Sequence, residues 1–349
     1  MKKDQMRMDR LPQEQQDASK VIVLANNKGG CGKTSTAIAL GMYYVRMGKN
    51  VMFVDADPQS NLTQRLGLSD EKCQDKRIGQ LFLNAHIADY EQAQRKLSQI
   101  VQYPYIYRVN TSVEKTGKVG LIPGEHVAEI EADAAEKRLA NNRFIDMNKR
   151  DIAQYYRRCI DFYRGYFNFI IIDTAPALEG NILNRVSVQA ADDIICPVDG
   201  LEAALGLYQL MTVFRGLTAS KHPNVLFSMI KYQEDPASYG IDITDTRLRN
   251  SVYRAMKDTF GDFVCDFGVK EQPGLRRNVA MFGRKTDYIR MCQEISGRLS
   301  LQRQNIFDVM TRDKYSAFEL VLEAIGKKAR NKDPRFKIPR YVGFNGVAS

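Results

Sequence analysis

Residues 28–35, with the sequence K-G-G-C-G-K-T-S, carry the side chains best suited to chemistry in this chain. They follow a short apolar run at 21–25 and precede a helical pattern. Glycines let backbone N–H groups approach phosphate oxygens closely, and the positive end of the following helix attracts the same anion. Lys33 adds a mobile charge for terminal phosphates, and the Thr34 hydroxyl is a suitable Mg²⁺ ligand. The segment therefore predicts a site for nucleotide phosphates and Mg²⁺.

Three aspartates stand where two further apolar runs end. Asp55 and Asp57 open the string D-A-D-P-Q-S-N-L-T, and Asp173 lies within F-I-I-I-D-T-A-P. Because the carboxyl ends of parallel strands meet at one edge of a sheet, we expect these carboxylates to face the phosphate loop. Carboxylates placed there orient an attacking water or hold Mg²⁺ through its water shell.

The loop also carries a family signature. The general phosphate-loop pattern G-x-x-x-x-G-K-[ST] requires a glycine five positions before Gly32, where this chain has Asn27. The eight residues instead match the pattern K-G-G-x-G-K-T-[ST]. The chain thereby resembles the deviant Walker A ATPases, which include the ParA partition proteins and the MinD membrane-cycling proteins. The likeness extends from residue 21 to about residue 230 and is loose over 268–283.

The resemblance implies an ATPase with ATP and Mg²⁺ as cofactors, whose turnover is weak until a partner protein stimulates it. It assigns the nucleotide to Lys28, Gly29, Gly30, Cys31, Gly32, Lys33, Thr34 and Ser35. It assigns catalysis to Lys28, Lys33 and Asp57, with Asp57 orienting the water. It assigns the metal to Thr34, Asp55 and Asp173. Residues 174–178 correspond to the segment that senses the γ-phosphate.

Lys28 stands before the glycines, where its charge points away from the γ-phosphate of its own loop. In the resembling family two subunits face each other across two ATP molecules, and this lysine reaches the phosphates of the partner. The resemblance therefore implies a homodimer that forms with ATP. There the lysine neutralises charge that develops during phosphoryl transfer, as an arginine finger does.

The elements that must position these residues follow a βαβ rhythm. Beyond the first run, apolar runs recur at 51–54, 119–122, 169–172, 194–198 and 225–230, and helical patterns lie at 34–47, 126–139, 151–163 and 203–217. Continuous apolar runs are typical of parallel strands buried on both faces. We predict an α/β fold, a mostly parallel twisted sheet with helices on both faces, as in P-loop NTPases of the deviant Walker A type.

The chain contains no repeat or proline-rich linker that divides it. We expect a polar N-terminal arm at 1–20, a single ATPase domain at 21–328 whose basic portion begins at about 243, and an irregular basic tail at 329–349. Only about twenty residues precede the first strand, so we expect no helix-turn-helix domain for sequence-specific operator binding. The arm lacks the apolar stretch of a secretory signal, and no run is long enough to span a membrane, so we expect a cytoplasmic protein.

The charged residues are unevenly distributed along the chain. The whole chain has 51 basic and 41 acidic side chains, and residues 243–340 alone hold 21 basic against 12 acidic. Such a stretch favours a polyanionic partner, either nucleic acid or an anionic membrane surface. By the ParA resemblance we expect non-specific double-stranded DNA, a nucleoid-associated location and a ParB-like centromere-binding or adaptor protein. Candidate phosphate contacts are Arg247, Arg249, Arg276, Arg277 and Lys285.

Two alternatives belong to the same superfamily. A MinD-like membrane-cycling or protein-positioning ATPase needs a C-terminal amphipathic helix, but Pro334 and Pro339 interrupt the tail, so we expect no membrane partner. A metal-cluster carrier needs a C-x-x-C pair, and the six cysteines are widely spaced. The chain has only three histidines, and no two of them lie at the spacing of metal ligands. We therefore expect neither a histidine-built metal site nor a Ser-His-Asp triad. We rank the partition ATPase first and the MinD-like protein second.

Overall fold

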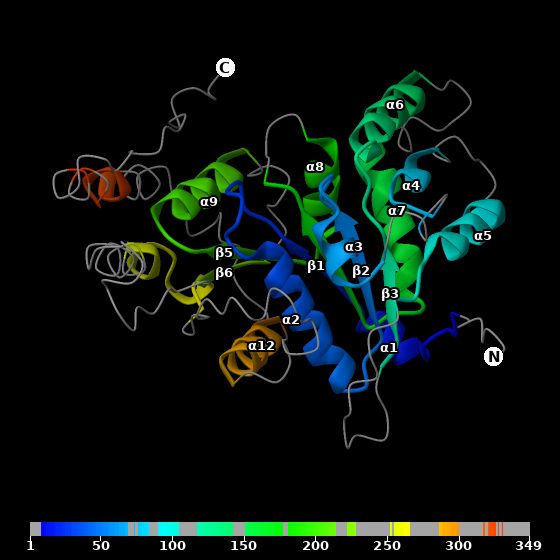
Figure 1. Ribbon diagram of the computed structural model, residues 1–349, viewed down its shortest axis with the longest axis horizontal. Helices are drawn as coiled ribbons and strands as arrows, with labels where there is room; N and C mark the ends of the chain where they lie inside the picture. Colours follow the sequence, from blue (N-terminus) through cyan, green and yellow to red (C-terminus); the bar gives the residue numbers. More distant parts are fainter. Residues whose placement is uncertain are drawn as a thin grey trace.

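Six parallel strands form one sheet in the order β3-β2-β4-β1-β5-β6 (Figure 1). The computed structural model describes residues 8–68, 73, 76–83, 90–104, 117–141, 151–176, 181–213, 222–227, 252, 255–265, 286–299, 317, 320–325, 327 and 330. The strands are β1 (Lys20–Leu24), β2 (Val51–Ala56), β3 (Val119–Ile122), β4 (Phe169–Thr174), β5 (Asp193–Val198) and β6 (His222–Phe227). The predicted parallel α/β sheet is confirmed.

The helices lie mostly between the strands along the chain. They are α1 (Gln13–Asp17), α2 (Lys33–Arg46), α3 (Asn61–Arg65), α4 (Gly79–Leu83), α5 (Tyr90–Ile100), α6 (Ala128–Asn141), α7 (Ile152–Arg164), α8 (Ile182–Ala190), α9 (Leu201–Val213) and α12 (Thr286–Leu299), with a 3₁₀ turn η3 (Gly261–Phe263). Each predicted strand lies within a few residues of its expected place. The strand predicted at 225–230 begins earlier, at His222, and residues 228–230 lie outside the described part.

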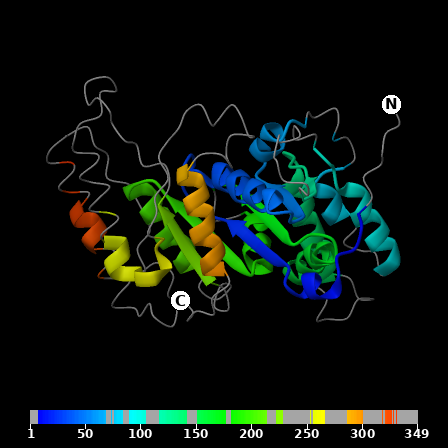
Figure 2. The same ribbon diagram turned by 90° about the horizontal axis from the view of Figure 1, so that it is seen from below.

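The sheet is buried on both faces because its strands carry apolar residues at consecutive positions. In β1, Val21 and Val23 pack on one side, whereas Ile22 and Leu24 pack on the other. The first side is covered by helices that include α6, α7, α8 and α9, and the second by α2, α3 and α12. Figure 2 shows α2 and α12 on the same side of the strands. Two apolar layers thus hold the strand ends that position the site.

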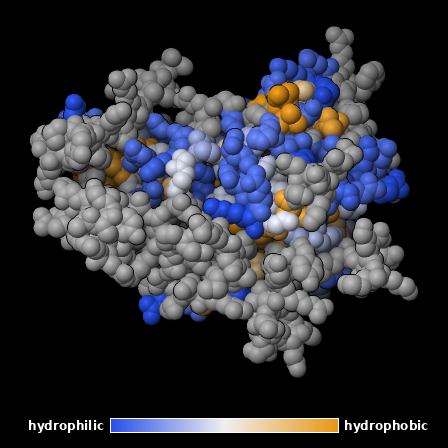
Figure 3. All heavy atoms as spheres, viewed as in Figure 1, coloured by the Kyte–Doolittle hydropathy of each residue, from blue (hydrophilic) through white to orange (hydrophobic). Residues whose placement is uncertain are grey.

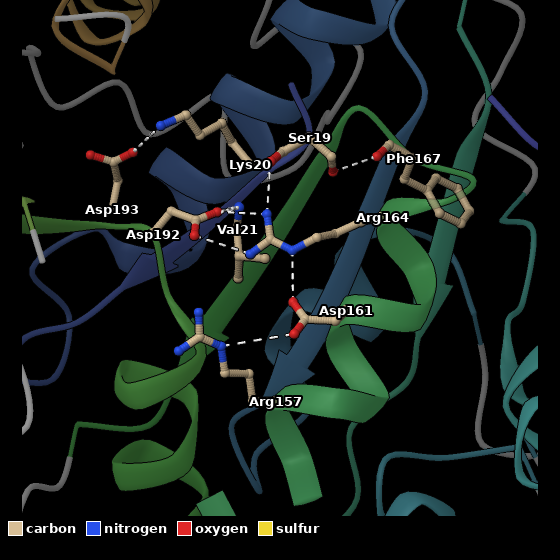
Figure 4. Close-up of polar contacts among 9 residues, drawn as sticks. All are labelled: Ser19, Lys20, Val21, Arg157, Asp161, Arg164, Phe167, Asp192 and Asp193. Carbon is tan, nitrogen blue, oxygen red and sulfur yellow. Dashed lines mark hydrogen bonds and ion pairs between the residues drawn. The ribbon is translucent and has the colours of Figure 1, made fainter. Parts of the chain in front are cut away.

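The amino ends of the central strands are fastened by Arg164 at the end of α7 (Figure 4). Its guanidinium donates to both carboxylate oxygens of Asp192, at 2.8 and 3.1 Å, and to the Ser19 carbonyl at 2.7 Å. Asp192 also accepts the backbone N–H of Val21 at 2.8 Å. We call this cluster of Arg164, Asp192, Ser19 and Val21 the amino-edge clamp. It joins α7 to β1 and to the start of β5, at the edge opposite the strand ends that carry the aspartates.

The segment before β1 is held against this same edge. The Leu11 N–H donates to the Gly165 carbonyl at 2.8 Å, and the Lys118 ammonium lies 2.6 Å from the Asp9 carboxylate. Residues 8–19 therefore pack on the domain in the described part of the chain. The predicted boundary between arm and domain stays a prediction, as does the tail, of which only residue 330 is described.

Most of the described surface in the space-filling view is hydrophilic, and a small apolar cluster lies near α6 (Figure 3). Val127 and Ile130 are exposed there, at 49% and 67%. Among the described residues, no helix is both long and apolar enough to cross a bilayer.

Candidate functional site

The phosphate-type loop joins β1 to α2 and depends on glycine. Gly30 and Gly32 have φ values of 77° and 98°, in the left-handed region that other residues avoid. Gly32 is the N-cap of α2, and among the described residues no side chain caps this end. The first turn of α2 also contains no acidic residue. Its free N–H groups and positive end therefore point into the loop, as an anion site requires.

Lys33 is buried in the loop, with 6% of its surface exposed. Its ammonium donates to the backbone carbonyls of Asn26 at 3.1 Å and Lys28 at 3.0 Å. These carbonyls belong to the loop and its start, so the Lys33 ammonium lies within the loop in which the phosphates are expected. Cys31 is also buried, and its thiol donates to the Lys28 carbonyl at 3.3 Å. Burial raises the pKa of this thiol, which suits a space-filling role in the loop.

Thr34 and Asp173 meet beside the loop. The Thr34 hydroxyl donates to Asp173 Oδ2 at 2.6 Å, and Asp173 is fully buried at the end of β4. Asp173 Oδ1 is buried without a hydrogen-bond partner among the described residues. A hydroxyl beside a carboxylate oxygen that lacks a donor is the oxygen chemistry that Mg²⁺ prefers. These two residues therefore fit a Mg²⁺ that takes its remaining ligands from phosphate and water.

Asp55 lies opposite Asp173 in the register of β2 and β4. Its Oδ2 accepts the Thr63 hydroxyl at 2.6 Å and the Thr63 N–H at 2.8 Å. Asp55 thus anchors α3, in addition to lying beside the carboxylate predicted for the metal. Gly124 completes this packing, since a Cβ there would lie 2.9 Å from the Asp55 carboxyl carbon.

Asp57 lies at the start of the turn that leads into α3. Its Oδ1 accepts the Gln59 N–H at 2.9 Å, and its carbonyl accepts the Ser60 N–H at 2.8 Å. Only 7% of its surface is exposed. The turn fixes the Asp57 backbone, so its carboxylate has a defined position beside the loop.

The electrostatics of these carboxyls favour positive charge in the site. Burial and the charge of Asp55 raise the pKa of Asp173 to about 7, and the charge of Asp57 acts in the same direction. Burial also raises the pKa of Asp55 to about 7, although hydrogen bonds from Thr63 oppose the increase. The Lys33 charge lowers the pKa of Asp173 and so opposes part of its increase, and a bound cation would act in the same direction.

Lys28 occupies a separate environment at the rim of the loop. Its ammonium lies 3.0 and 3.1 Å from the two carboxylate oxygens of Asp199 and 3.5 Å from Glu202 Oε2. Burial lowers the pKa of Lys28, but the charges and hydrogen bonds of both acids outweigh it and raise that pKa above the ordinary value. The sequence did not indicate Asp199 or Glu202, because no motif surrounds them. They follow β5, a strand that was predicted only as part of the core.

The structure brings the predicted residues of the loop together with Asp55, Asp57 and Asp173 at the carboxyl ends of β1, β2 and β4. Other predictions lie outside the described residues. These are the five candidate DNA contacts Arg247, Arg249, Arg276, Arg277 and Lys285, and residues 177–178 of the predicted γ-phosphate sensor.

Comparison with known proteins gives one family model and several relatives. The AAA domain model AAA_31 matches residues 19–227, which is more than half of the chain. A chromosome partitioning protein ParA from Caulobacter vibrioides is 26% identical over 296 residues, covering 80% of this chain and 94% of that protein. The sporulation initiation inhibitor protein Soj from Bacillus subtilis is 28% identical over 245 residues, covering 68% and 83%.

Solved structures share the fold. Apo McdA from Cyanothece has a TM-score of 0.58 at 20% identity, covering 81% of this chain and 100% of that one. Cobyrinic acid a,c-diamide synthase from Mycobacterium smegmatis, with a bound ATP analogue and magnesium, has a TM-score of 0.56 at 19% identity, covering 82% and 98%. The match of the family model, which spans the loop and all three aspartates, shows that the chain belongs to the AAA domain family AAA_31, within the ParA/MinD superfamily of ATPases.

Proposed function

We propose that this chain is a partition ATPase that forms an ATP-bound homodimer, binds DNA non-specifically, and leaves DNA when a ParB-like partner stimulates hydrolysis. The two lysines of the loop carry the proposal. Lys33 is buried among loop carbonyls, whereas Lys28 lies at the rim, paired with two acids and 28% exposed. One lysine thus serves the loop itself, and the other lies at the rim, where a second subunit would reach it. The name of the ParA relative supports chromosome partitioning as the process.

The residues of this chain divide the work as follows. The N–H groups of residues 29–34 and the ammonium of Lys33 bind the phosphates of ATP. Thr34 and Asp173, with Asp55 beside them, would hold Mg²⁺, which when bound would neutralise charge on the terminal phosphates. Asp57 orients the attacking water, and Lys28 of the facing subunit stabilises the charge that develops in the transition state. Asp55 fixes α3 and thereby the turn that carries Asp57.

The Lys28→Ala variant tests the two-subunit site. We expect it to retain part of the ATP affinity, because Lys33 and the loop N–H groups remain. It should lose ATP-dependent dimerisation in light scattering, and its hydrolysis rate should fall by about 10³-fold, as when an arginine finger is lost. The control is Lys118→Ala, which removes a lysine from an exposed ion pair at the opposite edge. An unchanged hydrolysis rate in Lys28→Ala would contradict the proposal.

Co-sedimentation with duplex DNA tests the second half of the proposal. The protein is incubated without nucleotide, with ADP and with ATP, at low and moderate salt, and a parallel set contains anionic liposomes. Binding to DNA that requires ATP supports a nucleoid-associated switch. Binding to DNA in every nucleotide state would mean that the basic stretch attracts DNA by its charge alone and that ATP does not control the binding. Capture by liposomes alone with ATP would favour the MinD-like alternative.

A further inference from the structure

The junction between β5 and α9 holds Lys28 inside its own subunit. Asp199 lies in this junction and Glu202 in the first turn of α9, and both carboxylates face the ammonium. The Asp199 side chain is only 15% exposed, so its contact with Lys28 is shielded from water. Charge-assisted hydrogen bonds of this kind are stronger than those at an open surface.

Hydrogen bonds from Asn26 hold the backbone around this contact. The Asn26 side-chain amide donates to the Pro197 carbonyl at 2.8 Å and the Ala203 carbonyl at 3.0 Å, and its oxygen accepts the Lys28 N–H at 2.9 Å. Gly206 permits this approach of α9, since a Cβ there would lie 2.5 Å from Asn26 Oδ1. These hydrogen bonds join the start of the loop to the start of α9. They hold the Lys28 backbone, so leaving the two acids requires a change in the Lys28 side chain rather than in its backbone.

One ammonium cannot bind Asp199 and the phosphates of a second subunit at the same time. The two carboxylates saturate Lys28 with negative charge in the single subunit, as the raised pKa of Lys28 also indicates. Each subunit must therefore break this ion pair before the two-subunit site is complete. The strength of the pair opposes dimerisation, and removing it should favour the dimer.

We propose that Asp199, assisted by Glu202, is a positioning residue that retains Lys28 in the single subunit and thereby sets the protein concentration at which the ATP-bound dimer forms. This inference rests on the proposed function, in which Lys28 acts across the dimer. The two acids compete for Lys28 with the ATP phosphates that are bound by a second copy of this chain.

The test measures dimerisation as a function of protein concentration with Mg²⁺ and a non-hydrolysable ATP analogue, by sedimentation equilibrium. Asp199→Asn keeps the shape of the side chain and removes its charge. We expect half-maximal dimer at about a hundredfold lower protein concentration, about tenfold for the ion pair of each of the two subunits, since a hydrogen bond to a charged group contributes on this scale. Asp199→Glu should restore the wild-type concentration. The matched control Asp9→Asn removes one carboxylate from an exposed ion pair at the opposite edge and should change nothing.

A second measurement distinguishes a positioning role of Asp199 from damage to the fold. At protein concentrations at which all of the protein is dimeric, the KM for ATP of Asp199→Asn should equal that of the wild type, because the loop and Lys33 are unchanged. If Asp199→Asn does not fold, Glu202→Gln replaces it, with a smaller shift in the same direction. An unchanged or increased dimerisation concentration in the folded variant would overturn the inference. The proposed function fails separately, if Lys28→Ala dimerises as readily as the wild type.

Discussion

At the scale of single residues, hydrolysis should depend on Asp57 as well as on Lys28. Asp57→Ala should bind ATP and dimerise normally, because neither Lys33 nor Thr34 contacts Asp57 in the described structure. Its turnover should fall by about 10²-fold or more, the usual contribution of a positioned acid–base group. Single-turnover hydrolysis measured with the dimer preformed checks this result. Normal turnover would place the orientation of water on another residue.

Thr63 makes a second prediction at this scale. Its hydroxyl donates to Asp55 at 2.6 Å and accepts the Gly124 N–H at 3.0 Å, and the residue is 3% exposed. Thr63→Val preserves the shape but leaves the buried Gly124 N–H unpaired and removes one of the two hydrogen bonds from residue 63 to Asp55, which should lower the free energy of unfolding by about 2 kcal/mol. Urea denaturation provides the measurement, and Thr63→Ser, which keeps the hydroxyl, should lose less than half as much. Equal losses in the two variants would mean that the methyl group rather than the hydroxyl stabilises this turn.

The sequence predicted the phosphate loop and the three aspartates because each belongs to a short local pattern. The pairing of Lys28 with Asp199 could not be predicted in this way, since the two residues are 171 positions apart. Their contact arises only when the loop before Lys28 is fastened to α9 by Asn26. The second role of Asp55, as an anchor for Thr63, was missed although the two residues are eight positions apart, because the pattern identifies residue types and not their hydrogen bonds.

At the scale of elements, the amino-edge clamp should stabilise the central strands in a pH-dependent way. Burial alone raises the pKa of Asp192, but hydrogen bonds and charge from Arg164 outweigh it and hold this pKa below its ordinary value. A carboxyl whose pKa is lowered by folding contributes stability above its unfolded pKa of about 3.9. That contribution disappears as the pH falls through the folded pKa.

Asp192→Asn isolates this effect. Near pH 7 we expect the variant to be about 2 kcal/mol less stable than the wild type, because Arg164 and the Val21 N–H lose a charged acceptor. Below about pH 4 the difference should shrink as the wild-type carboxyl is protonated. Urea midpoints of both proteins from pH 7 to pH 3 provide the comparison. A difference that stays constant over this range would show that the Asp192 charge contributes nothing.

Element boundaries were predictable where turn residues end an apolar run. Residues 119–122 were expected as a strand and form β3 with those same limits, because Pro123 and Gly124 follow the buried residues of the strand. Strand β6 begins three residues earlier than expected and includes Pro223. Proline lacks a donor and reads as a strand breaker, but it is tolerated at the edge of a sheet, where β6 lies in the described part. Helix α1 has five residues and no buried side chain, so its sequence gave no apolar periodicity to detect.

At the scale of the whole molecule, the basic stretch at 243–340 predicts a steep dependence of DNA binding on salt. Affinity for duplex DNA falls with log salt at a slope of about −0.9 for each neutralised phosphate. Replacing Arg276 and Arg277 by Ala should reduce the magnitude of that slope by about 2 for each subunit. Arg157→Ala, an exposed arginine on α7, serves as the control for net charge. A slope that is equally reduced in all variants would indicate a diffuse field rather than contacts at the predicted residues.

The strand order also determines when the site can be assembled during biosynthesis. Strand β1 is made first but lies in the middle of the sheet, between β4 and β5. Its hydrogen-bonding neighbours therefore leave the ribosome only after some 150 further residues are made, a delay of roughly 8 to 30 s at the usual elongation rate. Throughout this interval the nascent chain exposes an unpaired apolar strand, the kind of segment that chaperones protect. Nucleotide capture must accordingly await translation of the second half of the sheet, and truncated translation products should not compete with the finished protein for ATP.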